Sequence, residues 1–360
     1  MIVLGIETSC DETAAAVVRN GTEVLASEIS SQVELHSSYG GVVPELAARQ
    51  HLRNLGPVVA GALRRSGLDV GRLDAVAATS RPGLVPALLV GFNYAKGMAM
   101  AAGLPLIAVN HFTAHLYSCF LDRPEWLKRG DIFPLLALIV SGGHTSLALV
   151  REEGALTVVG RTIDDAAGEA FDKGAKILGL GYPGGPQIER AAAGGNPRRY
   201  KFPRGLTGGG GKPVAPADRF NFSFSGVKTA LLYRVRRQST VSPSDQADLA
   251  ASYQAALVDV LVKKTMAAAQ EYSASTVLLA GGVACNQVLR QRLQREVETA
   301  GRQWLAAAPH YCADNAAMVA GLAWHDLRQG RAAEMKADVQ ARLPDTLEPI
   351  TFFTEHKGGG

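Results

Sequence analysis

The sequence predicts an α/β protein made of two related halves. Apolar runs typical of buried strands alternate with amphipathic helical patterns along its 360 residues. Two segments, residues 3–18 and 136–150, each consist of a strand, a polar turn and a second strand, and one stands near the start of each half. The 39 glycines provide many positions where the backbone can turn tightly or approach a ligand closely. These observations favour a duplicated, two-lobed architecture that handles a ligand.

The composition is that of a folded chain. Hydrophobic residues make up 47% of the sequence, which excludes intrinsic disorder. The net charge of +4 permits a nucleic-acid partner without requiring one. The four cysteines are far apart and form no CxxC pair, so a reducing compartment, the cytoplasm, fits best. We expect no signal peptide, because Glu7 interrupts the apolar N-terminus, and no membrane span, because Asn93 and Lys96 interrupt the most apolar stretch.

The individual elements follow from periodicity and from the residues that interrupt it. The pattern predicts, in order, a helix over 43–66, a strand over 73–79, a helix over 86–102, a strand over 106–109, helices over 169–178 and 242–271, a strand over 276–280, and helices over 286–300 and 316–327. Residues 196–219 are rich in Pro, Gly and basic side chains, so we expect a mobile basic loop there.

The two similar turns are candidate ligand sites. Residues 7–13 combine Glu7, Asp11 and Glu12 with small hydroxyl residues, and residues 141–145 have the sequence Ser-Gly-Gly-His-Thr. Such turns expose backbone N–H groups or carboxylates at strand ends and can hold a phosphate or a metal ion. Taken alone, either turn is better explained as an ordinary hairpin.

Two histidines and one distant aspartate form a candidate metal site. His111 and His115 follow a predicted strand at a spacing that places both imidazoles on one helical face. Asp314 precedes a predicted helix, where it can supply a third ligand or simply cap that helix. Such a set suits Fe(II) or Zn(II) better than Mg²⁺ and leaves positions open for a substrate oxygen. A peptidase is disfavoured, because Phe112 follows His111 and no HExxH pattern exists.

Further segments have the composition of ligand-binding turns. Residues 280–286 place paired glycines between a predicted strand and a predicted helix, which suits a phosphate or simply tight packing. Residues 164–173 crowd carboxylates together, and Asp172 can accept hydrogen bonds from a ligand. Residues 221–229 can form an edge strand entering a helix or part of an RNA-facing surface. The GxGxxG match over 179–184 follows a helical run, so we reject a dinucleotide site.

Taken in order, these motifs resemble those of the TsaD family of tRNA N6-adenosine threonylcarbamoyltransferases. The resemblance runs from Met1 to about Gly330 and depends on residues 5–13, 39–45, 140–145, 164–173, 182–186, 222–229 and 280–286, with His111, His115, Asp314 and Asn315. Two places depart from the family's usual pattern. Phe112, Thr113 and Ala114 replace Met-Glu-Gly, and residues 81–86 replace Gly-Pro-Gly-Leu-Val-Gly with Arg-Pro-Gly-Leu-Val-Pro. The metal ligands remain.

The resemblance implies a two-lobed, actin-like ATPase (ASKHA) fold with duplicated mixed-sheet subdomains and an interlobe cleft that holds a nucleotide. We expect an N-terminal lobe over 1–115, completed by a C-terminal helix over about 315–345, and a C-terminal lobe over 116–314. The resemblance implies that one divalent metal, with Fe(II) favoured and Zn(II) possible, is held by His111, His115 and Asp314. It implies that threonylcarbamoyl-AMP is bound by Ile139, Val140, Ser141, Gly142, Gly143, Asp172, Gly185 and Asn286.

The activity implied by the resemblance is that of an N6-L-threonylcarbamoyladenine synthase. The threonylcarbamoyl group would pass from threonylcarbamoyl-AMP to N6 of the adenosine 3′ of the anticodon, in tRNAs that read codons beginning with A. The implied partners are tRNA, a TsaB-like paralogue, a TsaE-like ATPase and a TsaC-type enzyme that supplies the adenylate. Because an exocyclic amine is a poor nucleophile, positioning and charge stabilisation must supply most of the rate. Candidates to relay the proton are Asp11, Glu12, Asp172 and His144.

Three other functions are weighed against transfer. An ATP-dependent kinase or ATPase of the same fold would hydrolyse ATP and ignore tRNA. A metallopeptidase lacks support from an HExxH motif. A TsaB-like scaffold without activity would not need the three metal ligands.

Overall fold

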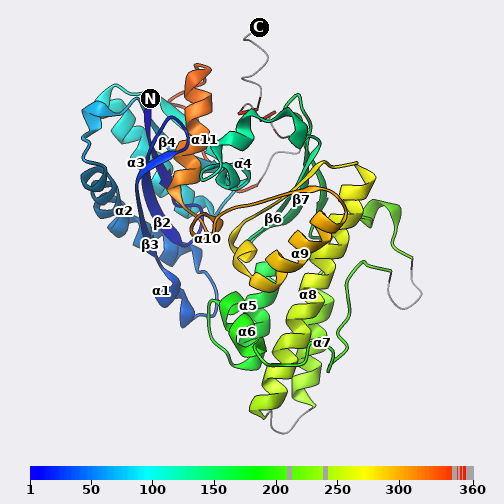
Figure 1. Ribbon diagram of the computed structural model, residues 1–360. Coiled ribbons are helices and arrows are strands. Elements are labelled where there is room, and N and C mark those ends of the chain that lie inside the picture. The colour runs from blue at the N-terminus through cyan, green and yellow to red at the C-terminus, as the bar shows by residue number, and fades with distance from the viewer. Residues whose placement is uncertain (209–212, 238–241, 343–346, 348, 351, 354–360) are drawn as a thin grey trace. The chain divides into compact units, whose positions relative to one another are not determined.

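The computed structural model describes residues 1–208, 213–237, 242–342, 347, 349–350 and 352–353. The chain forms two compact units. Unit 1 comprises Met1–Gly130, Glu152–Leu156 and Ala307–Gly360, and unit 2 comprises Asp131–Arg151 and Thr157–Ala306. Within the described residues, each unit contains one five-stranded mixed sheet (Figure 1). No helix among these residues has the length and apolar character needed to cross a membrane.

The sheet of unit 1 has the strand order β3-β2-β1-β4-β5. Its strands are β1 (Ile2–Glu7), β2 (Glu12–Arg19), β3 (Glu23–Ser31), β4 (Ala75–Arg81) and β5 (Leu106–Asn110). Gly5 of β1 pairs with Ala16 of antiparallel β2 and with Ala77 of parallel β4. The helices are α1 (Val33–Ser37), α2 (Pro44–Ser66), α3 (Val85–Ala102), α4 (His111–Tyr117), α10 (Pro309–Cys312) and α11 (Ala316–Arg328).

Helices cover both faces of this sheet because successive side chains of a strand point to opposite faces. Leu4 and Ile6 of β1 are buried in one apolar cluster with Leu55 of α2 and Phe92 of α3. Gly5, between them, faces the other way. A Cβ at this position would lie 2.5 Å from the backbone oxygen of Ala316 and 2.7 Å from the nitrogen of Ala320, both in α11. The last long helix of the chain therefore packs directly on its first strand.

This close approach predicts a large effect from a single methyl group. Gly5→Ala should lower the free energy of unfolding by about 2–3 kcal/mol, because the overpacked atom meets backbone and α11 or β1 must move. Gly97→Ala is the matched control. Gly97 is exposed within α3 and has open space at its Cβ position, so alanine should stabilise the helix by about 0.5–1 kcal/mol. Chemical denaturation of both variants checks this, and equal effects would contradict the packing described.

The sheet of unit 2 has the strand order β10-β9-β6-β7-β8, which repeats the order of unit 1 read from its other end. Its strands are β6 (Leu135–Val140), β7 (Thr145–Val150), β8 (Leu156–Arg161), β9 (Thr276–Ala280) and β10 (Gln303–Ala306). The helices are α5 (Ala167–Leu178), α6 (Gly184–Ala192), α7 (Ser225–Arg236), α8 (Pro243–Glu271) and α9 (Gln287–Thr299). In each unit the first strand is antiparallel to the second and parallel to the fourth.

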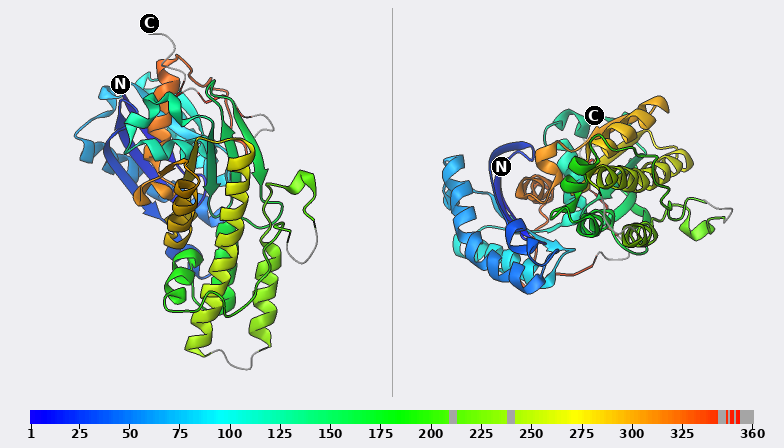
Figure 2. Two further views of the ribbon diagram at one scale, coloured as in Figure 1. Left: turned by 45° about the vertical axis from the view of Figure 1, so that its right-hand side comes forward. Right: turned by 90° about the horizontal axis from the view of Figure 1, so that it is seen from below.

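Short 3-10 turns connect these elements. They are η1 (Val70–Arg72), η2 (Ser118–Phe120), η3 (Pro124–Lys128), η4 (Gly130–Ile132), η6 (Pro216–Asp218) and η7 (Gly282–Cys285). Among the helices of unit 2, α8 is the longest at 29 residues. It runs beside α7 in both views of Figure 2.

Several sequence-based boundaries need correction. The C-terminal helix expected over about 315–345 is shorter, because α11 ends at Arg328 and Gly330 follows with a left-handed φ of +67°. Unit 1 extends to Gly130, beyond the expected limit at residue 115, because the Phe120 ring packs 6.3 Å from that of Tyr117 in α4. Residues 307–314, expected in the C-terminal lobe, also belong to unit 1.

The expected basic loop over 196–219 has described parts that are anchored. The guanidinium of Arg204 donates two hydrogen bonds to Asp259 of α8, at 2.6 and 2.9 Å. The Tyr200 hydroxyl donates to Asp245 at 3.0 Å. Residues 209–212, at the centre of that expectation, lie outside the described residues.

Candidate metal centre and glycine-rich turns

Helix α4 places two imidazoles one turn apart. Its N-cap is Asn110, whose side-chain oxygen accepts hydrogen bonds from the backbone N–H groups of Phe112 and Thr113. This cap fixes His111 as the first helical residue, and His115 follows one turn later on the same face. Both side chains are buried, with residue exposures of 5% and 1%. The spacing expected from the sequence is therefore realised inside the protein and not on its surface.

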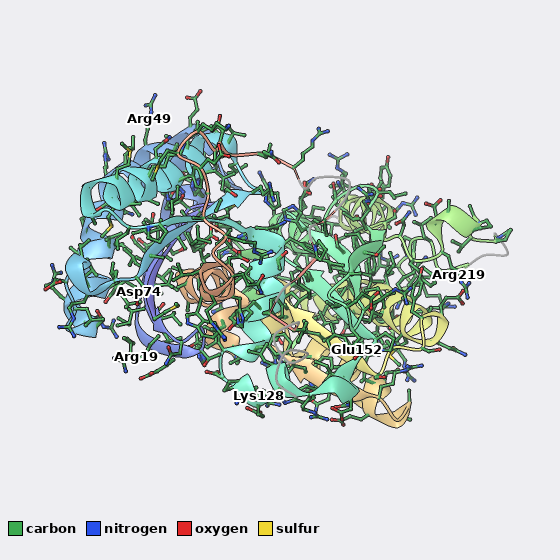
Figure 3. The ribbon with its side chains drawn as sticks, turned by 90° about the horizontal axis from the view of Figure 1, so that it is seen from above. Arg19, Arg49, Asp74, Lys128, Glu152 and Arg219 are labelled. Atoms are coloured by element: carbon green, nitrogen blue, oxygen red, sulfur yellow. The ribbon has the colours of Figure 1, made fainter. Side chains whose placement is uncertain are left out.

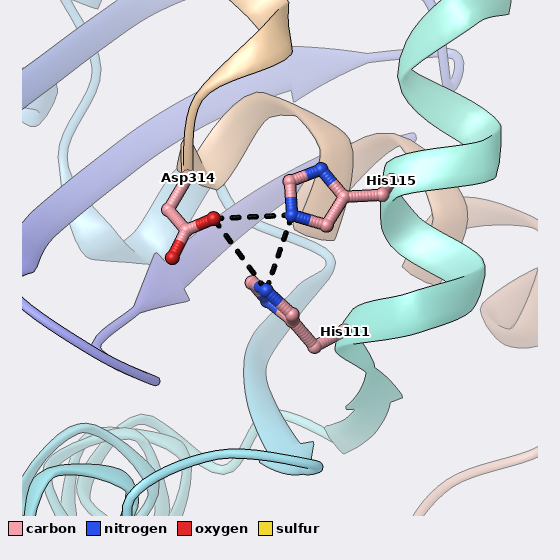
Figure 4. Close-up of side chains that lie close together, drawn as sticks. All are labelled: His111, His115 and Asp314. Atoms are coloured by element: carbon pink, nitrogen blue, oxygen red, sulfur yellow. Dashed lines mark hydrogen bonds and ion pairs between the residues drawn. The ribbon is translucent and has the colours of Figure 1, made fainter. Parts of the chain in front are cut away.

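Asp314 joins these histidines from the segment between α10 and α11. Its Oδ1 lies 3.0 Å from Nε2 of His115 and 3.5 Å from Nε2 of His111 (Figure 4). The two Nε2 atoms are 3.1 Å apart. Asp314 is not the cap of α11, because the side chain of Asn315 accepts the N–H of Met318 at 3.0 Å and takes that role. The capping alternative for Asp314 is therefore wrong.

These three atoms have the arrangement of a metal-ligand set. The candidate ligand atoms of His111, His115 and Asp314 all lie within 4.8 Å of one another. Atoms bound to one tetrahedral or octahedral ion at about 2.1 Å lie about 3.0–3.4 Å apart, close to the separations present here. Two imidazole nitrogens and a carboxylate oxygen converge on one point, so one cation placed there is within reach of all three. The residues present thus fit a divalent metal ion.

Glu7 supports this centre; the sequence analysis placed it in a candidate ligand-binding turn but did not connect it with His111. Its Oε2 lies 2.9 Å from Nδ1 of His111, the nitrogen that faces away from Asp314. The same carboxylate accepts the Thr79 hydroxyl at 2.6 Å and the Ser9 N–H at 2.5 Å. A carboxylate on the second ring nitrogen fixes the orientation of a metal-binding histidine and makes it a better ligand. The only sequence signal for Glu7 was an acidic residue ending an apolar strand.

Burial and nearby charge have opposite effects on the pKa values of His111 and Glu7. Burial alone lowers the pKa of His111, but the carboxylates of Glu7 and Asp314 outweigh it and raise the value to about 9 in the metal-free chain. Burial raises the pKa of Glu7, and the charge and hydrogen bond of His111 bring the value below its usual range. The metal-free chain therefore holds a buried ion pair between the two side chains.

Asp11 and Glu12 lie in the turn that follows Glu7. Asp11 is buried, and Glu12 begins β2 with the Ser31 hydroxyl 3.3 Å from its Oε1. Burial, together with the negative charges of Asp11 and Asp314, raises the pKa of Glu12 well above its ordinary value. The structure thus brings both proton-relay candidates of this turn into one acidic environment with the candidate metal ligand Asp314.

The corresponding turn of unit 2 has a different character. The N–H of Ser141 donates to the carbonyl of His144 at 2.8 Å, and the N–H of His144 donates to the Ser141 hydroxyl at 3.2 Å. Gly142 and Gly143, at its tip, are exposed, and no heavy atom lies within 4 Å of their Cβ positions. Ile139 and Val140, by contrast, are buried in β6 between β7 and β9. The turn therefore offers an accessible backbone.

The other adenylate-binding candidates lie at helix starts of unit 2 or, in the case of Asp172 within α5, contact one. Asp172 accepts the N–H of Gly184 at 2.7 Å, at the start of α6, and Gly185 has open space beyond its Cα. The side-chain oxygen of Asn286 caps α9 through the N–H of Leu289 at 2.9 Å. Its NH₂ group donates to Gln254 at 2.8 Å. Asp172 and Asn286 thus already make structural hydrogen bonds.

The crowded carboxylates over 164–173 are explained in part by the fold. Asp164 accepts hydrogen bonds from the hydroxyls of Ser223 and Ser225 and from the N–H of Phe224, which holds the start of α7. Asp165 forms ion pairs with Lys173 and Lys228. Residues 221–229 accordingly enter α7 after a single parallel bridge between Thr162 and Phe222. The sequence analysis expected an edge strand that enters a helix here. The helix is confirmed, whereas the strand is reduced to this one bridge.

Comparisons with solved structures identify the fold. Full-length HypF in its phosphate- and nucleotide-bound form aligns with a TM-score of 0.59 at 13% identity, over 92% of this chain and 56% of HypF. Component A of (R)-2-hydroxyglutaryl-CoA dehydratase from Acidaminococcus fermentans aligns with a TM-score of 0.52 at 14% identity, over 90% and 98% of the two chains. Identities this low show the fold alone. With the repeated strand order, they confirm the expected actin-like (ASKHA) class.

Comparisons with curated sequences identify the family. A tRNA N6-adenosine threonylcarbamoyltransferase from Thermomicrobium roseum is 49% identical over 366 aligned positions, which cover 96% of this chain and 97% of the relative. One from Pelobacter propionicus is 48% identical over 342 positions, which cover 95% and 96%. The family model described as TsaD, tRNA N6-adenosine threonylcarbamoyltransferase, matches residues 23–321. This chain therefore belongs to the TsaD family of tRNA-modifying transferases.

Proposed function

We propose that this chain transfers the threonylcarbamoyl group of threonylcarbamoyl-AMP to N6 of the adenosine 3′ of the anticodon, in tRNAs that read codons beginning with A. The observation that carries the proposal is family membership over nearly the whole chain, with relatives named for transfer to N6 of a tRNA adenosine. The kinase or ATPase and the metallopeptidase are not favoured, since the relatives carry neither name. In the reaction, N6 attacks the carbamoyl carbonyl and AMP leaves.

We propose that His111, His115 and Asp314 hold one divalent ion, Fe(II) in preference to Zn(II). Two imidazoles and one carboxylate are typical of Fe(II) sites that keep positions open for further ligands. When bound, such an ion supplies Lewis-acid stabilisation of negative charge on oxygen. Glu7 has a positioning role, because its carboxylate fixes the ring of His111 from the side opposite Asp314.

The roles of the remaining site residues are proposed from their accessibility and charge. The exposed N–H groups of Gly142 and Gly143 suit a phosphate or a developing oxyanion, which needs donors that are already oriented. The adenylate would further contact Ile139, Val140, Ser141, Asp172, Gly185 and Asn286. We favour Glu12 as the proton carrier among Asp11, Glu12 and His144, because burial and the neighbouring negative charges raise the pKa of its carboxyl and so favour its protonated form.

The partners follow from the same family membership. We propose that the chain works in the cytoplasm with a TsaB-like paralogue and a TsaE-like ATPase. A TsaC-type enzyme would supply threonylcarbamoyl-AMP, since nothing in this reaction makes the mixed anhydride that it consumes.

The decisive experiment mixes the purified, metal-loaded protein and its proposed partner proteins with threonylcarbamoyl-AMP and an unmodified tRNA transcript. Mass spectrometry of the digested RNA should reveal threonylcarbamoyladenosine at the position 3′ of the anticodon, in an amount that grows with enzyme concentration. ADP release from ATP with unmodified RNA would instead support the ATPase. Metal analysis of anaerobically purified protein decides between iron and zinc.

A further inference from the structure

One segment of unit 2 carries more excess positive charge than the whole chain does. Of the 37 basic residues in the chain, ten lie between residues 196 and 237, together with only one of the 33 acidic residues. The rest of the chain therefore has 27 basic and 32 acidic residues and is net negative. The modest overall charge of +4 conceals this asymmetry.

Part of this charge is used to hold the fold. Arg204 pairs with Asp259, Arg219 with Glu271 and Lys228 with Asp165. Figure 3 labels Arg219 on its exposed loop. These three cations stabilise the packing of the loop and of α7 against their neighbours in unit 2. They are not the ones available for a ligand.

The other described cations lie on two neighbouring segments, the loop at 198–201 and the end of α7, and together we call them the basic face: Arg198, Arg199, Lys201, Arg234, Arg236 and Arg237. All six are exposed, and within the described residues none of them makes an ion pair. Tyr200 joins the loop to α7, because the guanidinium of Arg234 lies 4.6 Å from its ring centre and that of Arg199 lies 5.9 Å away. The carboxylate of Asp245 accepts a hydrogen bond from the Tyr200 hydroxyl. Hydrogen bonds from Ser242 and Tyr200, together with the positive charges of Arg199 and Arg234, lower the pKa of Asp245.

The basic face also exposes an aromatic ring. Tyr233 of α7 is 57% exposed, and Arg237, the C-cap of the helix, follows it by four residues. Val227 and Leu231 are buried on one side of α7, and Tyr233, Arg236 and Arg237 lie on the side away from them. Arg234 lies nearer the buried side, where its guanidinium contacts the Tyr200 ring. Arginines interleaved with accessible tyrosine are typical of surfaces that bind RNA, where phosphates meet the cations and unpaired bases stack on rings.

We propose that the basic face is a docking surface for the phosphate backbone of tRNA. This inference rests on the proposed function in one respect, that tRNA is the substrate. Unpaired cations gain affinity by releasing counterions from the RNA, and the net negative remainder of the chain disfavours other modes of RNA binding. An acidic protein or an anionic membrane would match the charge as well, but neither is the substrate of the proposed reaction.

The test is tRNA binding by the full-length chain at several salt concentrations. The variant R198Q/K201Q/R236Q/R237Q removes four charges from the basic face and keeps Arg199 and Arg234, which hold Tyr200. Its affinity for a labelled tRNA should fall by about 10- to 100-fold at 150 mM salt, and the slope of log K against log salt should decrease by about 3. In the transfer assay, KM for tRNA should rise by a similar factor while kcat is retained.

The matched control is R53Q/R64Q/R72Q/K128Q, which removes four exposed cations from unit 1, including Lys128 labelled in Figure 3. Its tRNA affinity should stay within about threefold of the unaltered chain. An equal loss in both variants, no loss in the basic-face variant, or no tRNA binding by the unaltered chain would overturn the proposal. Failure to form threonylcarbamoyladenosine would instead defeat the proposed function, and the binding comparison would still decide on the surface.

A second variant separates RNA from the other anionic partners. Tyr233→Leu keeps an apolar side chain and removes the ring, so it should weaken tRNA binding by about 5- to 20-fold with little change in salt slope. Vesicles containing phosphatidylserine and polyglutamate serve as probes of the rival partners. The assignment to RNA would be overturned if the basic-face variant lost binding of either probe but bound tRNA as well as the unaltered chain does.

Discussion

Asp314→Asn should remove the bound metal and lower threonylcarbamoyl transfer by at least about 100-fold. The amide keeps the shape of the side chain but loses the negative charge that faces His111 and His115, and it is a much weaker metal ligand. The fold should survive, because Asn315 and not Asp314 caps α11. Metal content per chain, the transfer rate and the thermal unfolding temperature together check this expectation.

Asp122→Asn is the matched control for this variant. Asp122 is exposed and pairs with His310 at 3.5 Å, so it repeats an aspartate–histidine contact in unit 1 away from the three ligands. Its metal content and transfer rate should equal those of the unaltered chain. Full metal occupancy in Asp314→Asn would remove that residue from the centre.

His111→Ala should cost about 3–5 kcal/mol of unfolding free energy in addition to abolishing metal binding. The cause is Glu7, which is fully buried and would lose the only cation that faces it in the described structure. A simple loss of activity in this variant would therefore be ambiguous. The double variant E7Q/H111A leaves no buried carboxylate without a cation. Its free energy of unfolding should be about 2 kcal/mol higher than the sum of the two single-variant effects predicts. Denaturation of all four proteins in the presence of a chelator measures the coupling.

The same pair predicts how stability changes with pH in the metal-free chain. The folded pKa of His111, about 9, lies above its ordinary unfolded value of about 6.5. The stabilisation is therefore fully present below about pH 6.5 and is lost as the pH rises through about 9. The destabilising effect of Glu7→Gln should shrink over that interval. The ion pair would be contradicted if the destabilisation caused by Glu7→Gln did not change with pH, or if the effects of the two single variants on the free energy of unfolding were additive.

The clustering of the candidate metal ligands could be predicted from sequence because two of them follow a local rule. The spacing of His111 and His115 places them on one helical face wherever the segment is helical. Asp314 was harder, since a carboxylate before a helix is usually a cap, and only the structure shows that its neighbour Asn315 takes that task. Glu7 could not be found by any local rule, because its partner lies 104 residues away.

The fold, too, was predictable where a local sequence pattern exists and not elsewhere. The continuous apolar runs of β1, β4, β6 and β9 were recognised because central strands are buried on both faces. The edge strands β3 and β10 lack such runs, and their mixture of exposed and half-buried positions gave no clear period. The adenylate candidates of unit 2 illustrate a further limit. The pattern identified Asp172 and Asn286, but not that both side chains also hold helix starts.

The return of the chain from unit 2 to unit 1 has a consequence for biosynthesis. The first strand of unit 1 is made before unit 2, yet the helix that covers Gly5 is made only after the whole of unit 2. Unit 2 can therefore finish folding first, while the earliest-made unit waits for its last helix with an apolar sheet face uncovered. The cation-binding centre is completed later still than its histidines, because translation must reach Asp314. An ion held by all three candidate ligands can therefore be bound only after Asp314 has been made, and a chain terminated before that residue would lack the helix that covers Gly5.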